Sequence, residues 1–141
     1  MFADSWLLWA ILSAVFAAVM TICAKLGLRG VDPDFAQLVR TAVVLLGLAV
    51  LVPLSGKWRA LNSLDGRTWA FLILSGLATG ASWLCYFRAL NLGEASRVAA
   101  VDKLSVVLVA VFGVLLLHER LGSTGWLGIA LVVAGLLCLV K

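Results

Sequence analysis

Apolar residues along this chain gather into five stretches that are separated by short polar connections. Each stretch holds about 20 residues, the length that an α-helix needs to cross a bilayer. Lipid offers the backbone no hydrogen-bond partner, and a helix satisfies its own backbone groups within each span. The pattern therefore predicts an all-α integral membrane protein, a bundle of five transmembrane helices. The spans are expected at about residues 6–25, 35–54, 68–90, 95–117 and 123–140.

The composition agrees with this prediction and excludes several classes of soluble protein. Of the 141 residues, 64% are apolar and 13% are charged, with a mean hydropathy of +1.14. A soluble domain is about half apolar and about a quarter charged, and one of this size has no core large enough to bury so much apolar surface. A soluble enzyme, a nucleic-acid-binding domain and a disordered tail are excluded. Residues 1–141 are expected to form one transmembrane domain, because no linker or low-complexity tract divides them.

Tryptophans sort by membrane face when the spans alternate in direction. Five of the six open spans one, three and five or lie in the second loop, and they are Trp6, Trp9, Trp58, Trp69 and Trp126. Because tryptophan is enriched at membrane–water interfaces, this face, called face A, is expected to carry an aromatic belt. The opposite face, called face B, carries the loop before span two, the 91–94 turn and the C-terminus. At face B, Asp32 and Pro33 are typical of a helix start.

Positive charge is nearly balanced between the two faces. Face A carries four basic residues, which are Lys57, Arg59, Arg67 and Arg120. Face B carries five, which are Lys25, Arg29, Arg88, Arg97 and Lys141. At these positions basic residues set topology and contact lipid headgroups, so the net charge of +4 does not indicate a nucleic-acid partner. A small difference between the faces gives almost no orienting bias. We therefore expect dual topology and an antiparallel homodimer; the alternative is a single orientation with a separate partner chain.

Catalytic and metal-binding motifs are missing from the sequence. The chain has one histidine, His118, so a two-histidine metal site cannot form within it. A Walker A loop ending at Gly56-Lys57 would need glycine where Leu51 stands. No cofactor, no metal and no enzymatic activity are therefore expected.

Ionisable residues inside the spans are the most informative feature. Arg40 lies about seven residues into span two from face B, and Asp102 and Lys103 lie at a matching position in span four. At about 1.5 Å per residue, all three are about 10–12 Å deep. Trp83 and Tyr86 of span three approach the same layer. Charged groups at such depth are costly unless they are paired or face a cavity.

Two interpretations of this layer are open. In the functional one, Arg40, Trp83, Tyr86, Asp102 and Lys103 form a substrate-binding layer in which charges recognise a solute and aromatic rings stack against it. Two cations and one carboxylate then favour an anionic or zwitterionic solute. In the structural one, Arg40 and Asp102 form an ion pair, Lys103 extends to the headgroups, and Tyr86 belongs to a second aromatic belt.

Strings along nearly the whole chain occur in an order and spacing that carry a family resemblance. They are Lys25-Leu-Gly-Leu, Val31-Asp-Pro, Arg40-Thr41, LSGLATGASWLCYFRAL at 74–90, GEASRVAAVDKLS at 93–105, ERL at 119–121 and WLGIAL at 126–131. In a five-span frame, this set resembles a single EamA-type domain of the drug/metabolite transporter superfamily. Ala100 stands where related sequences often carry proline, so a kink in span four is not assumed. His118 stands where many relatives have glycine.

The resemblance implies a function. In that family, two such domains commonly occur in one chain as inverted repeats that form a transporter of small metabolites. We expect a secondary transporter of small organic metabolites or amphipathic compounds that works by alternating access in the bacterial inner membrane. Its expected partners are the lipid bilayer, a second copy of the chain and a small-molecule substrate. The alternative is a non-transporting membrane subunit or assembly factor that needs a partner chain.

Overall fold

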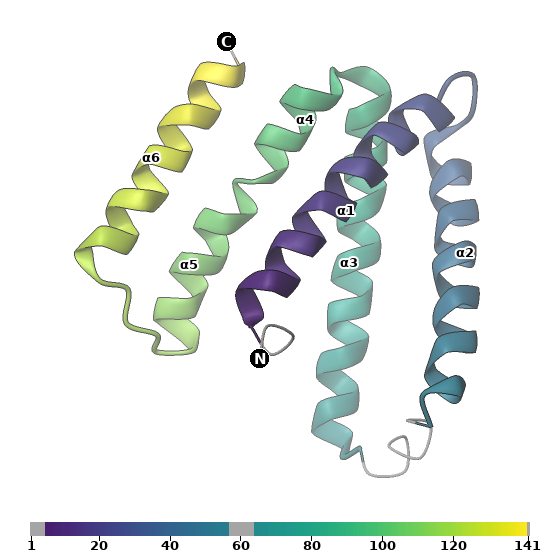
Figure 1. Cartoon of the computed structure of the whole chain (residues 1–141), viewed down its shortest axis with the longest axis horizontal. Coiled ribbons are helices and arrows are strands. Elements are labelled where there is room, and N and C mark those ends of the chain that lie inside the picture. The colour runs from purple at the N-terminus through teal and green to yellow at the C-terminus, as the bar shows by residue number, and fades with distance from the viewer. Residues whose placement is uncertain (1–4, 57–63, 141) are drawn as a thin grey trace. The chain divides into compact units, whose positions relative to one another are not determined.

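The computed structural model describes residues 5–56 and 64–140. Within these ranges the chain is helical and contains no strand (Figure 1). The helices are α1 (Trp6–Gly27), α2 (Pro33–Leu54), α3 (Gly66–Leu92), α4 (Ala95–Asp102), α5 (Ser105–Leu116) and α6 (Ser123–Val140). Since α4 and α5 together form one span, five segments of the described chain are long and apolar enough to cross a membrane. This confirms the predicted fold class, an all-α membrane protein with five transmembrane helices.

The helices belong to two compact units. Residues 23–91 form one, called the α2–α3 unit, and residues 1–22 and 92–141 form the other, called the α4–α6 unit. In the α2–α3 unit, the buried side chains are those of Leu28, Gln37, Phe87 and Leu90. In the α4–α6 unit, α6 packs along α4 and α5, and the buried residues include Ala100 and Leu136. Most other apolar side chains are exposed, as expected of surfaces that face lipid or another helix.

The start of α2 follows the signal in the sequence. Asp32 is the N-cap, and its carboxylate accepts hydrogen bonds from the amides of Asp34 at 3.0 Å and Phe35 at 3.1 Å. Pro33 occupies the first turn, where its missing N–H costs nothing because that donor has no intrahelical acceptor. At face A, Asp65 precedes α3 in the same way, and hydrogen bonds from the side chain and amide of Thr68 lower the pKa of its carboxyl.

The fourth span is interrupted, although the sequence predicts one continuous helix over 95–117. α4 ends at Asp102 and α5 begins at Ser105. Between them, the amides of Lys103 and Leu104 donate to carbonyls only three residues back, each at 3.0 Å. This tighter 3₁₀ turn replaces the α-helical pattern. The span has no proline. The interruption instead lies at two adjacent charged residues, Asp102 and Lys103, whose side chains pair with each other at 3.6 Å.

α5 ends in a turn that explains an unusual histidine. His118 has a φ of 55°, and the amides of Leu117 and Glu119 both donate to the carbonyl of Gly113, at 3.1 and 3.0 Å. A residue with a β-carbon pays about 1–2 kcal/mol in this left-handed conformation, whereas glycine adopts it readily. The position therefore favours glycine over histidine.

Replacing His118 with glycine is expected to stabilise the protein by about 0.5–1 kcal/mol, because relief of the left-handed strain exceeds the extra backbone entropy of glycine. Chemical unfolding of the purified protein in detergent measures the change. His118→Val should shift the midpoint in the opposite direction, because a β-branched residue tolerates positive φ poorly. Equal stability of the valine and glycine variants would contradict this account of the turn.

Some residues used in the sequence predictions lie outside the described ranges. They are Trp58 of the predicted belt and Lys57, Arg59 and Lys141 of the charge balance. The described belt residues Trp6, Trp9, Trp69 and Trp126 are all exposed, as a belt requires. Trp83, by contrast, is only partly exposed.

Candidate functional site

Arg40 of α2 lies over aromatic rings of α3. Its guanidinium carbon is 4.2 Å from the centroid of the Trp83 ring and 5.4 Å from that of Phe87. Trp83 and Phe87 are four residues apart, so they lie on the same face of α3. Phe87 is buried, and Arg40 and Trp83 are half-buried. The negative faces of the rings attract the cation, but they do not neutralise its charge.

A short polar network on α2 holds the guanidinium in place. Gln37 is one turn before Arg40 and only 4% exposed. Its side-chain oxygen accepts a hydrogen bond from Nη1 of Arg40 at 3.3 Å, and its Nε2 donates to the hydroxyl of Thr41 at 3.0 Å. The Thr41 hydroxyl in turn donates to the backbone carbonyl of Gln37 at 2.8 Å. Gln37 and Thr41 therefore satisfy each other, and one amide oxygen remains to orient Arg40.

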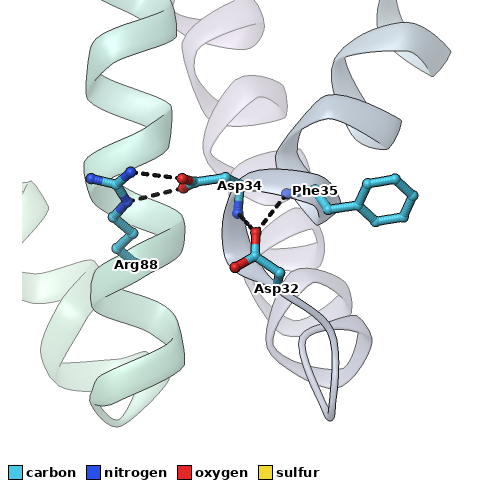
Figure 2. A network of polar contacts seen from close by, with 4 residues as sticks. All are labelled: Asp32, Asp34, Phe35 and Arg88. Carbon is cyan, nitrogen blue, oxygen red and sulfur yellow. Dashed lines mark hydrogen bonds and ion pairs between the residues drawn. The ribbon is translucent and has the colours of Figure 1, made fainter.

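The carboxylate nearest in sequence to Arg40 is already engaged. Asp34 receives two hydrogen bonds from Arg88 of α3, from Nε to Oδ1 at 2.9 Å and from Nη2 to Oδ2 at 2.7 Å (Figure 2). This two-bond geometry is the favoured one for arginine and carboxylate. In the same view, Asp32 caps the helix from below Asp34, and the ring of Phe35 points away from Arg88. Within the described part of the α2–α3 unit, no carboxylate pairs with Arg40.

The Asp34–Arg88 pair is expected to tie α2 to α3 near face B. Asp34→Asn and Arg88→Gln should each lower the unfolding midpoint in detergent, and the double variant should lose no more than the larger single loss. This follows because each single change leaves the other partner without its two hydrogen bonds. A double variant whose loss equals the sum of both single losses would show that the two residues act independently.

The other predicted site residues divide between the two units. Tyr86 is half-buried and lies one turn from Trp83 on α3. Asp102 and Lys103 lie in the α4–α6 unit, at the interruption between α4 and α5, where they form an ion pair with each other. The Arg40–Asp102 pair stays a prediction.

Three residues of this region are not predicted from the sequence as part of the site. Gln37 lies three residues before Arg40, and Thr41 follows Arg40 directly. Phe87 follows Trp83 by one helical turn. A polar residue one turn before a membrane-embedded arginine is the signal for Gln37, because its side chain can reach the guanidinium. Arg88 was assigned to the topology signals alone, whereas the structure gives it a partner in Asp34.

The described residues offer no cluster of metal ligands. Among residues 5–56 and 64–140, no group of three or more His, Cys, Asp or Glu side chains is arranged to hold a metal ion. The chemistry that the described side chains offer is recognition: a cation fixed against aromatic surface inside an apolar span.

Comparisons with known proteins agree on the kind of protein. The EamA-like transporter family matches residues 4–141. A relative from Sinorhizobium sp., named as an uncharacterized transporter in the cobO 3′ region, is 55% identical over 137 residues, which is 97% of this chain and 97% of the relative. No solved structure matches the chain.

Proposed function

Since the chain belongs to the EamA-like transporter family of membrane transporters, we propose that it is a secondary transporter of small organic metabolites or amphipathic compounds. It works by alternating access, as an antiparallel homodimer in the bacterial inner membrane. The sequence contains no nucleotide-binding motif that would support an ATP-driven mechanism. Transport therefore follows a solute or ion gradient.

One observation carries this proposal: the Arg40–Trp83 contact inside an apolar span. An arginine in a membrane helix costs several kcal/mol unless it is paired or faces water. Arg40 contacts aromatic rings and donates one hydrogen bond to a neutral amide oxygen. In the described part of its own unit, no carboxylate pairs with it. The carboxylate that the structural interpretation assigns to Arg40, that of Asp102, belongs to the other unit. A cation that is oriented but not neutralised is what a solute-binding position requires.

Two features support the homodimer. The basic residues of the two faces number four and five, so the chain has little preference for one orientation. In addition, Gly76 and Gly80 of α3 are exposed, and no other group of the α2–α3 unit lies within 4 Å of the position that a β-carbon would take. A pair of small residues four apart lets a second helix approach closely in lipid. Oppositely inserted copies would supply the inverted repeat that such transporters use.

Reconstitution into liposomes tests the transport function. Purified protein without any other chain is expected to accelerate the uptake of at least one solute from a panel of labelled metabolites, relative to protein-free liposomes. Uptake that appears only when a second, different chain is added would favour the alternative, a membrane subunit that needs a partner. Absence of uptake under both conditions would contradict the proposed function.

A compartment-sensitive reporter fused after Lys141 tests dual topology. Signal is expected from both sides of the membrane. A control variant carrying Arg67→Gln and Asn91→Lys changes the face counts from four and five to three and six, and it should report from one side only. A wild-type reporter that is active in a single compartment contradicts dual insertion.

A further inference from the structure

Four of the eight lysines and arginines in the described chain have an anionic or carbonyl partner. Arg88 binds Asp34, Arg97 binds Glu94 at 3.0 Å, and Lys103 pairs with Asp102. Lys25 donates to the carbonyl of Leu90. Arg40 lies inside a span and differs from these four, because its partners within the α2–α3 unit are a neutral amide oxygen, two aromatic rings and the nearby Tyr86, with which it interacts electrostatically. Among the predicted site residues of the α2–α3 unit, the positive charge therefore lies on this one guanidinium, which no carboxylate of the described part of that unit balances.

The geometry also fixes how Arg40 can bind. Guanidinium is planar, and its N–H groups form a fork that matches the two oxygens of a carboxylate. The guanidinium carbon lies over the Trp83 ring, and Nη1 donates a hydrogen bond to Gln37. Most of the remaining N–H donors have no acceptor among the described residues of this unit. The edge of the fork is thus oriented for one planar, bidentate anion.

The surroundings limit the anion further. One cation balances one negative charge, so a singly charged carboxylate is neutralised, whereas a dianionic phosphate would leave a net negative charge inside the span. Gln37 and Thr41 use their hydrogen-bonding groups on each other and on Arg40. The other described neighbours of the guanidinium are aromatic residues: it contacts the rings of Trp83 and Phe87 and interacts electrostatically with Tyr86. A solute bound here therefore meets a carboxylate receptor next to apolar and aromatic surface.

We propose that Arg40 is the receptor for the carboxylate of the transported solute, and that this solute is a monocarboxylate with an apolar or aromatic body. The inference rests on the proposed transport function, which it narrows to one class of substrate. Trp83 acts as a positioning residue, because its ring holds the guanidinium in place by a cation–π contact. Lysine does not replace arginine here, because an ammonium does not form the two parallel hydrogen bonds.

Protection of Arg40 from an arginine-specific reagent tests this without requiring transport. The full chain, purified in detergent, is treated with phenylglyoxal, and the modification rate of each arginine is followed by mass spectrometry. Three matched probes are added separately: N-acetylphenylalanine, which carries the carboxylate, its neutral amide N-acetylphenylalaninamide, and the cation phenylalaninamide. Arg29, an exposed arginine of the same unit, is the internal reference.

N-acetylphenylalanine is expected to slow the modification of Arg40 about tenfold when the probe is present at ten times its Kd, following simple occupancy. The amide and the cation should leave the Arg40 rate unchanged, and no probe should change the Arg29 rate. Equal protection by all three probes, or no protection by the carboxylate, overturns the proposal. An Arg40 that does not react even without a probe also overturns it, because a resident partner such as Asp102 would then hold the fork.

A binding readout separates failure of this inference from failure of the proposed function. Carboxylate-specific protection of Arg40 without uptake in liposomes would support the receptor role of Arg40 and contradict the transport function. Uptake of other solutes without protection of Arg40 would support the transport function and contradict the receptor role. A second measurement is the thermal stabilisation that N-acetylphenylalanine gives the protein. The wild-type protein should be stabilised, whereas Arg40→Lys, which keeps the charge but lacks the arginine fork, should not be. Equal stabilisation of both proteins would contradict recognition by the arginine fork.

Discussion

Arg40→Gln is expected to reduce carboxylate uptake into liposomes about 10- to 100-fold, while the variant stays at least as stable as the wild-type protein. The loss reflects a missing charge-assisted hydrogen-bonded pair, which contributes about 1.5–3 kcal/mol. Stability is retained because the substitution removes a cation that no carboxylate of its unit neutralises, and such a cation is costly in a membrane span. Initial uptake rates and unfolding midpoints in detergent measure the two effects.

Arg29→Gln is the matched control, since it removes the same charge from an exposed turn of the same unit. Its uptake should equal that of the wild type. The structural interpretation predicts the opposite pattern for Arg40→Gln: a large loss of stability, because an ion pair with Asp102 would be broken and one charge left alone. An unstable Arg40→Gln protein that is rescued by Asp102→Asn would therefore contradict the receptor role.

If a pH gradient drives transport, Asp102 is the candidate proton carrier, and Asp102→Asn is then expected to abolish gradient-driven accumulation, a loss of at least about tenfold, while solute exchange without a gradient continues. Asp102 lies at the interruption between α4 and α5, and its pairing with Lys103, at 3.6 Å, is longer than a hydrogen bond. A carboxylate in an interrupted membrane helix can accept and release a proton as the site changes sides. Asparagine has a similar shape but cannot carry the proton.

Glu94→Gln is the control for this prediction. It removes the same charge from the start of the same span, where Glu94 pairs with Arg97 across one helical turn. Gradient-driven accumulation should survive that change. If Asp102→Asn is instead strongly destabilised, by about 3–5 kcal/mol, the residue is a structural counter-ion. A stable Asp102→Asn protein with undiminished accumulation and unchanged pH dependence would contradict both roles.

Local signals account for what the sequence predicts well. Helical spans follow from runs of apolar residues, and the start of α2 follows from the capping ability of Asp32 and the fixed φ of Pro33. Counting residues from the span ends assigns Arg40 and Trp83 to one depth, and the structure shows them in contact. Depth is readable from sequence because a helix rises by a constant amount per residue.

Rotation of a helix about its axis is much harder to infer from depth alone. The Asp34–Arg88 pair and the burial of Gln37 depend on which faces of α2 and α3 meet, and a single sequence gives weak information on that in an evenly apolar span. The interruption after Asp102 escaped prediction for a different reason. Proline is the usual local signal of a broken helix, and here the change to a 3₁₀ turn occurs without one. The left-handed turn at His118 is visible in sequence only through the glycine of relatives.

The most direct test compares two proteins in one assay: initial uptake of labelled N-acetylphenylalanine, at mildly alkaline pH, into liposomes that contain either the wild-type chain or Arg40→Gln. Protein-free liposomes give the background, which alkaline conditions keep low because the neutral acid is scarce. If Arg40 is the carboxylate receptor, uptake by the wild-type protein exceeds uptake by Arg40→Gln at least about tenfold, because the variant loses one charge-assisted pair. Equal rates of uptake for the two proteins would contradict that role.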